Sequence, residues 1–424
     1  MLTRIVHPSP ALEAFLQPLV DALTQPQQRH LLDMADAVLV TEDRKTLAAL
    51  QRQFLDNTDP GNWADFLRIS PWHADAVRDA LRRQQLAWLI AESQRRGLPK
   101  VLYLNLDDSL GKKDKQTHRL EPVDWFFDHN ESTPGVPRYH KAFCYLECTA
   151  KVGPLTVTLD LRLYLRARTV RRLNRQRPPE QRLHFHSKNE LARAMLDSLR
   201  PLLPPDWTVY VQFDSWYASE RLLKYVHRQG WHTVCALKSN RKLQGQRLRD
   251  YATTLQHRRY TRFRVTAADG HRTTYYARDA VGRLSHLPFE VRVIFSKRHP
   301  QARSWAYFLS TDLARTVGAT LRGYGGRWSC EVVNFYVKTQ LGMADFRVWS
   351  HAAVDRYVVA VHLAWAYIER RYAEERSAHC RTLGDVIRRH REEHAASWLT
   401  AALQEVLATG AVAPVLQRFL RQPA

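Results

Sequence analysis

The chain has 424 residues, of which 45% are hydrophobic and 10% aromatic, so wholesale disorder is excluded and there is room for two or three domains. Lys and Arg number 64 against 42 Asp and Glu, and this formal net charge of +22 favours a polyanion such as nucleic acid as partner. No apolar run approaches 18 residues and the N-terminus lacks a signal-like stretch, so we expect no membrane partner and a cytoplasmic location. Five scattered cysteines predict free thiols.

The first 95 residues are predicted to be helical. Apolar residues recur there at helical spacing, as at Leu12, Phe15, Leu16 and Leu19. Glycine is nearly absent, and further helices are expected near residues 30–40 and 74–92.

From residue 100 the pattern changes to short apolar runs separated by turns and helices, which indicates an α/β core. The first run, 101–106, ends at Asp107 and Asp108, and a later strand ends at Asp214. The expected elements are, in order, strands at 101–106, 141–150 and 154–165, a helix at 188–203, a strand at 207–213, a helix at 217–229 and a strand at 231–237.

The next segment, 240–312, is β-patterned and interrupts this core. We expect a tight turn at Asp269-Gly270. Beyond Arg371 the chain is expected to be helical and highly charged. The pair Glu369 and Glu374 is expected on a solvated helix face. The strands expected in the segment are 260–266, 272–277, 289–295 and 304–310.

A single stretch concentrates the chemistry. Arg327, Glu331 and Lys338 project within about 40° of one another on a helix, and Tyr324 stands just off that face. The carboxylate suits a hard divalent metal, and the flanking groups suit a phosphate backbone. A solvated helix face with an Arg327–Glu331 salt bridge is the alternative.

The spacing Tyr-x2-Arg-x3-Glu-x6-Lys resembles the signature of bacterial insertion-sequence DDE transposases of the insertion-sequence-four type and their close relatives, and the resemblance extends over roughly residues 100 to 370. It implies a ribonuclease-H-like catalytic core interrupted by a β-rich insertion. The implied regions are a helical DNA-binding domain (1–95), the first part of the core (96–239), the β-rich insertion (240–312), the last part of the core with the glutamate helix (313–371) and a helical C-terminal region (372–424).

The resemblance also implies a metal site. Two Mg²⁺ ions about 4 Å apart, with Mn²⁺ as a substitute, would be held by Asp107, Asp214 and Glu331. Side chains alternate along a strand, so only one of Asp107 and Asp108 faces the metals; the pattern Asp-x-Ser favours Asp107, and Asp108 stays the alternative. For Asp214 the competing interpretation is an ordinary strand-end aspartate or the N-cap of the next helix.

DNA contacts follow from the same resemblance. Tyr324, Arg327 and Lys338 are expected to bind phosphates near the cleaved end. Lys238 follows a core strand and is a further DNA-binding candidate, with an exposed basic loop as the alternative. Trp305 is a candidate for stacking on a flipped base, although a tryptophan on a strand is more often part of a core.

The function implied is that of a transposase that excises and inserts a mobile element, by hydrolysis and by attack of the freed 3′ hydroxyl on target DNA. It would bind double-stranded DNA, both the terminal inverted repeats and the target, as a homodimer associated with the bacterial nucleoid. The alternatives are a domesticated, non-catalytic DNA-binding protein and a ribonuclease-H-like nuclease without strand transfer. The repeat sequence, target preference, cleavage pathway and free oligomeric state stay open.

Overall fold

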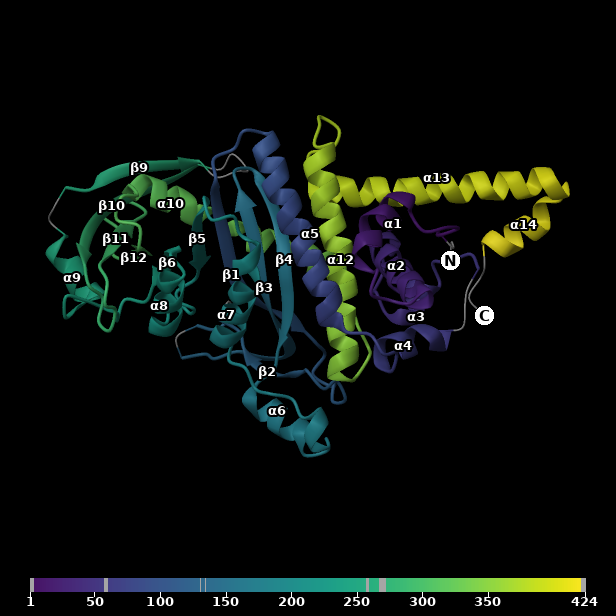
Figure 1. The fold of residues 1–424 in the computed structure, drawn as a ribbon, viewed down its shortest axis with the longest axis horizontal. Coiled ribbons are helices and arrows are strands. Elements are labelled where there is room, and N and C mark those ends of the chain that lie inside the picture. Colours follow the sequence, from purple (N-terminus) through teal and green to yellow (C-terminus); the bar gives the residue numbers. More distant parts are fainter. Residues whose placement is uncertain are drawn as a thin grey trace.

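A computed structural model of the protein describes residues 4–56, 60–129, 131–133, 135–256, 259–266 and 272–420 (Figure 1). Its strands are β1 (Val101–Lys112), β2 (Asp124–Phe127), β3 (Tyr139–Val152), β4 (Leu155–Tyr164), β5 (Thr208–Phe213), β6 (His232–Leu237), β7 (Lys242–Leu243), β8 (Gln246–Arg247), β9 (Thr261–Thr266), β10 (Arg272–Gly282), β11 (Val291–Lys297) and β12 (Ala306–Ser310). Its α-helices are α1 (Pro10–Leu16), α2 (Gln25–Val40), α3 (Leu47–Gln51), α4 (Pro60–Arg68), α5 (Ala74–Arg95), α6 (Ala167–Asn174), α7 (Lys188–Leu199), α8 (Glu220–Arg228), α9 (Leu248–Thr254), α10 (Val317–Gly325), α11 (Trp328–Thr339), α12 (His351–Glu375), α13 (Leu383–Thr409) and α14 (Val412–Phe419).

The core is a mixed sheet. β3 pairs antiparallel with both β1 and β4, whereas β1, β5 and β6 run parallel, which gives the local order β4-β3-β1-β5-β6. The predicted succession of three strands, helix, strand, helix and strand is observed, with β2 and α6 as additions. This mixed α/β architecture is consistent with a ribonuclease-H-like fold.

The predicted β segments after residue 240 continue the same sheet. β12 pairs antiparallel with β6, and β11, β10 and β9 follow outward, as the green strands of Figure 1 show. The turn expected at Asp269-Gly270 lies outside the described residues. Residues 240–312 therefore extend the core sheet, with β12 joined to β6 through backbone hydrogen bonds.

The two long helices α5 and α12 lie side by side against β4 (Figure 1). α12 is buried along most of its length, because α2, α4 and α13 pack against it as well. Helices from both ends of the chain thus share one hydrophobic core with α12. Among the described residues, no helix is long and apolar enough to cross a membrane.

Glu369 corrects one expectation. Glu374 is exposed as expected, but Glu369 is only 5% exposed on the face of α12 that packs against β4. Its carboxyl oxygens accept hydrogen bonds from the amide (2.7 Å) and the hydroxyl (2.9 Å) of Thr158. Burial raises the pKa of Glu369 to about 8.

This burial makes the stability of the protein pH-dependent. The native state keeps a proton on Glu369 up to about pH 8, whereas an unfolded chain releases it near pH 4.5. The free energy of unfolding should therefore fall as the pH rises from 5 to 8, by roughly 3 kcal/mol from this group. In urea unfolding at the two pH values, Glu369→Gln should remove that part of the fall, and Glu374→Gln should leave it unchanged. An equal fall in all three proteins would contradict the assignment.

Candidate active site

Asp107 and Asp214 occupy equivalent positions on two parallel strands. The last paired residues of β1 and β5 are Asn105 and Gln212, and each aspartate follows two residues later. Because the strands are parallel, both carboxylates lie at the same edge of the sheet. Burial is the main cause that raises the pKa of Asp107, and Arg327 opposes it. The negative charges of Asp108 and Asp214 raise this pKa further.

β1 does not end where the sequence predicts. It continues through Asp107 and Asp108 to Lys112, because β3 keeps pairing with it after β5 has ended. In this register Asp107 lies opposite Glu147. The polar residues are thus held in an extended backbone that fixes their directions.

The two neighbouring aspartates have different partners. Asp107 lies under α11, where it forms an ion pair with Arg327. Asp108 lies against α7, where it is paired with Lys188 (2.5 Å) and accepts a hydrogen bond from the hydroxyl of Tyr217 (2.8 Å). The alternation of side chains along β1 therefore gives Asp108 its own counter-charge on the opposite face of the sheet.

Glu331 is carried by α11, which packs against β1 and β3. The expected single helix from Tyr324 to Lys338 is wrong: α10 ends at Gly325, and Arg327 is the N-cap of α11. The amides of Gly326, Arg327 and Cys330 instead bond to carbonyls three residues back. Two consecutive glycines favour this tighter turn because they have a low helix propensity.

Arg327 lies between two of the carboxylates. Its guanidinium contacts Asp107 and lies 3.9 Å from the Oε1 of Glu331, whose side chain is 47% exposed. Burial raises the pKa of Asp107 to about 6, even though the guanidinium acts in the opposite direction. The pKa of Arg327 is raised as well, because burial, which lowers it, is outweighed by the charge of Asp107 together with smaller contributions from neighbouring groups.

Tyr324 and Lys338 border the same carboxylates. Lys338 donates a hydrogen bond from Nζ to the hydroxyl of Ser109 (2.5 Å). Tyr324 packs against Phe308, with ring centroids 5.0 Å apart, and burial raises its pKa to about 12. Arg327 and Lys338 thus contact the part of β1 that carries Asp107, whereas Tyr324 packs against β12.

Asp214 begins a tight turn. Its Oδ1 accepts hydrogen bonds from the amides of Trp216 (2.9 Å) and Tyr217 (3.3 Å), so it caps this turn, whereas Ser219 caps the next helix. Beside the turn is a pocket of about 330 Å³. The lining residues are Ser215, Trp216, Lys238, Asn240 and Arg241.

The two remaining candidates for DNA binding, Lys238 and Trp305, differ in exposure. Lys238 is exposed and lines this pocket at the end of β6. Trp305 precedes β12 at the same edge but is partly buried, with its ring under the Nζ of Lys297 (4.3 Å) and beside Tyr260. Trp216 was not predicted from the sequence as a functional residue, although it is 40% exposed and follows the strand-end Asp214 by two residues.

Glu147 was also overlooked. It is fully buried on β3, and its ligand atoms and those of Asp107 and Cys330 lie within 4.8 Å of one another. Asn334 donates to its Oε1 (2.9 Å), while its Oε2 has no hydrogen-bond partner among the residues that the structure describes. A glutamate inside the apolar run Cys144-Tyr-Leu-Glu-Cys148 was the available signal.

The donor set fits a hard divalent cation. Asp107, Asp214, Glu331 and Glu147 supply carboxylate oxygens, which are the ligands that Mg²⁺ and Mn²⁺ prefer. The guanidinium of Arg327 already compensates negative charge between two of them. Asp214 and Glu331 are not part of the 4.8 Å cluster of Asp107. Arg327 is the residue that links Glu331 to Asp107.

Comparison with known proteins places the chain in a family. The family model described as DDE superfamily endonuclease matches residues 18–281, which is more than half of the chain and includes Asp107 and Asp214. No curated protein matches the sequence. The matched region ends within β10, so the Tyr324–Lys338 pattern lies beyond it. Members of this family are nucleases or transposases that act on DNA, and the chain belongs to the DDE superfamily of endonucleases.

Proposed function

We propose that the protein is a DNA transposase of the insertion-sequence-four type, which cleaves the ends of a mobile element and joins them to target DNA. The observation that carries the proposal is the position of Asp107 and Asp214 at one edge of parallel strands, with Glu331 on a helix packed against β1. Carboxylates from separate elements that converge at a sheet edge are what a two-metal phosphoryl-transfer site requires.

In this proposal Asp107, Asp214 and Glu331 hold two Mg²⁺ ions, and Mn²⁺ substitutes for them. The ions would activate the attacking oxygen and stabilise the leaving oxygen of an in-line displacement. Asp107 is preferred over Asp108, because Asp107 faces α11, which carries Glu331, whereas Asp108 faces α7 and pairs with Lys188. Arg327 then exchanges its carboxylate partners for a phosphate of the DNA, which its planar guanidinium can bind through two hydrogen bonds.

The surface next to these carboxylates is suited to DNA. Lys238 and Arg241 place positive charge beside Asp214, and the exposed ring of Trp216 offers a face for a base. Lys338 lies at β1, where it contacts Ser109, and Tyr324 packs on Phe308 of β12, the strand that pairs with β6. With a net charge of +22, binding should weaken steeply as salt increases.

A homodimer that holds two element ends together completes the proposal. α13 extends beyond the rest of the molecule (Figure 1). Leu399, Leu403 and Leu407 recur at intervals of four residues on it and are 53%, 55% and 85% exposed. Such a row is suited to pairing with a second copy. The proposed layout keeps residues 1–95 as the region that binds the terminal repeats.

A nuclease without strand transfer would use the same carboxylates, and the family match supports a nuclease and a transposase equally. The joined product separates these two functions. A non-catalytic DNA-binding protein would have no physical need for three converging carboxylates.

The test is excision from a supercoiled plasmid that carries the gene with its flanking DNA. We expect release of the element with Mg²⁺ and none with EDTA, and Glu331→Gln should lower the rate on the order of 10³-fold, because an amide is a poor metal ligand. Glu374→Gln is the matched control, since this exposed glutamate also pairs with an arginine four residues away. Excision by Glu331→Gln at the wild-type rate would overturn the proposal.

A further inference from the structure

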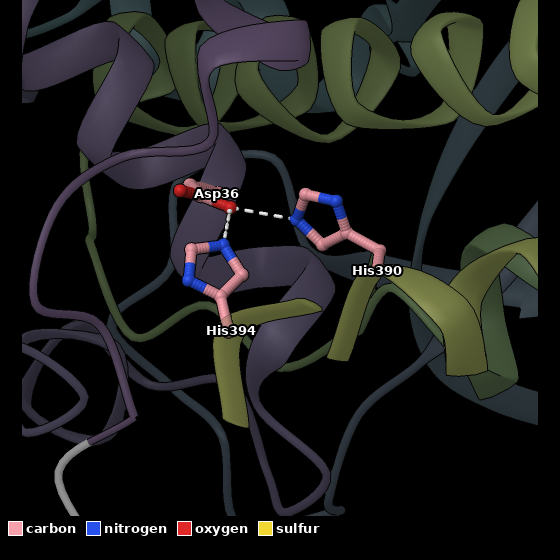
Figure 2. A group of neighbouring side chains, drawn as sticks. All are labelled: Asp36, His390 and His394. Atoms are coloured by element: carbon pink, nitrogen blue, oxygen red, sulfur yellow. Dashed lines mark hydrogen bonds and ion pairs between the residues drawn. The ribbon is translucent and has the colours of Figure 1, made fainter. Parts of the chain in front are cut away.

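A second cluster of metal-ligating side chains lies far from the sheet edge, between helices from opposite ends of the chain. Asp36 belongs to α2, and His390 and His394 belong to α13. Figure 2 shows both imidazole rings directed at the same carboxylate. Their Nε2 atoms lie 2.7 and 2.9 Å from one oxygen, Oδ1 of Asp36.

The surrounding structure orients these ligands. The two histidines are four residues apart, so they share one face of α13. The other carboxylate oxygen of Asp36 accepts a hydrogen bond from the amide of Ser9 (2.9 Å). The ring of Tyr367 packs edge-on against His390, with centroids 5.6 Å apart. Supporting contacts of this kind fix the directions of metal ligands in proteins.

The cluster is almost completely enclosed by protein. The side chains of Asp36 and His390 are fully buried and that of His394 is 4% exposed. Burial favours the neutral acid, but hydrogen bonds from the two histidines outweigh it and lower the pKa of Asp36 to about 2. In the described parts of the chain no Lys or Arg pairs with Asp36, so the two imidazoles are the groups that face its buried carboxylate.

We propose that Asp36, His390 and His394 bind a transition-metal ion, for which Zn²⁺ is the best match, and that this ion fastens α13 to α2. Two imidazole nitrogens and one carboxylate oxygen form a donor set typical of zinc sites, with bonds of about 2.0 to 2.2 Å. To place a tetrahedral ion between them, each Nε2 atom has to move away from Oδ1 of Asp36 by only about 0.5 Å. A divalent ion would also interact favourably with the buried carboxylate of Asp36.

The fourth position is suited to water. Ser9 and His394 line a cavity of about 1310 Å³ that also reaches Tyr367 and Arg371. Glu393 precedes His394 but is engaged by Arg371 (2.6 Å), so it does not join the ligands. This site is distinct in chemistry from the oxygen-rich carboxylates at the sheet edge, and it does not depend on the proposed transposase function.

The test uses Co²⁺ as a spectroscopic probe in the full-length protein after chelator treatment. One equivalent of Co²⁺ should produce the visible d–d absorption of a four-coordinate site, and one equivalent of Zn²⁺ should abolish it. Zn²⁺ should also raise the thermal unfolding midpoint by a few degrees. The double variant Asp107→Asn/Glu331→Gln should keep both responses, which separates this site from the carboxylates at the sheet edge.

His390→Asn and His394→Asn should each lose the absorption band and the Zn²⁺-induced shift, whereas His379→Asn, an exposed histidine just before α13, should keep them. If the two variants do not fold, the wild-type titration decides alone. Absence of the band and of the shift in wild type would overturn the proposal. So would a band that persists in a folded His390→Asn or His394→Asn, or an unfolding midpoint that depends on imidazole protonation but not on added metal.

Discussion

Asp107→Asn is expected to abolish Mg²⁺-dependent DNA cleavage, with a loss of about 10³-fold or more, while Asp108→Asn keeps cleavage within about tenfold of wild type. The reason is the alternation of side chains along β1. Asp107 faces α11 and Arg327, whereas Asp108 faces α7 and is neutralised by Lys188. Asp107 lies on the face of the sheet that α11 and Glu331 cover, and Asp214 lies at the equivalent position after β5.

Single-turnover cleavage of a labelled duplex that carries the element's end measures this difference, with circular dichroism to show that both variants fold. The pair is well matched, because the same change is made at adjacent positions. A stability loss in Asp108→Asn is expected from the unpaired Lys188 and does not affect the comparison of folded protein. Loss of cleavage in Asp108→Asn with activity retained in Asp107→Asn would reverse the assignment.

Asp160→Ala is expected to lower the free energy of unfolding by about 3 to 5 kcal/mol, which is the usual cost of breaking a buried ion pair. Asp160 is 1% exposed on β4 and forms ion pairs with Arg82 (2.7 Å) and Arg162 (2.9 Å), with Arg78 at 3.6 Å. Arg78 and Arg82 come from α5, so this carboxylate joins the helix to the sheet. Its removal leaves guanidinium groups without their shared buried partner.

Urea unfolding measures this loss. Asp206→Ala is the control, because Asp206 and its partner Lys100 are both 55% exposed, and exposed pairs contribute roughly 0 to 1 kcal/mol. Similar losses in the two variants would show that the buried network does not stabilise the packing of α5 on β4.

The succession of strands and helices along the chain was predictable because it depends on local patterns. The apolar runs that form β1, β5 and β6 are short and are bounded by turn residues, and the turn at Gly153 separates β3 from β4. Asp214 was found for the same reason, since it directly follows an apolar run. Local pattern also failed where pairing overrides it: Asp107-Asp108-Ser109 reads as the end of a strand, but β3 extends β1 to Lys112.

Other features depend on contacts between residues that are distant in sequence. The ion pair of Arg327 with Asp107, which is 220 residues away, was not predicted from the sequence. Glu369 was expected in solvent, yet the packing of α12 on β4 buries it against Thr158. The contact between Asp36 and His390 spans 354 residues. Helical periodicity specifies which face of a helix a residue occupies but not what covers that face.

Joining of a pre-cleaved element end to plasmid DNA is the measurement that tests the central claim most directly. A labelled duplex with a free 3′ hydroxyl would be incubated with target plasmid, Mg²⁺ and either wild type or Glu331→Gln. We expect the label to become covalently attached to the plasmid with wild type alone, and only when Mg²⁺ is present. Plasmid that is nicked or cut by wild type without acquiring label would contradict strand transfer and identify a nuclease.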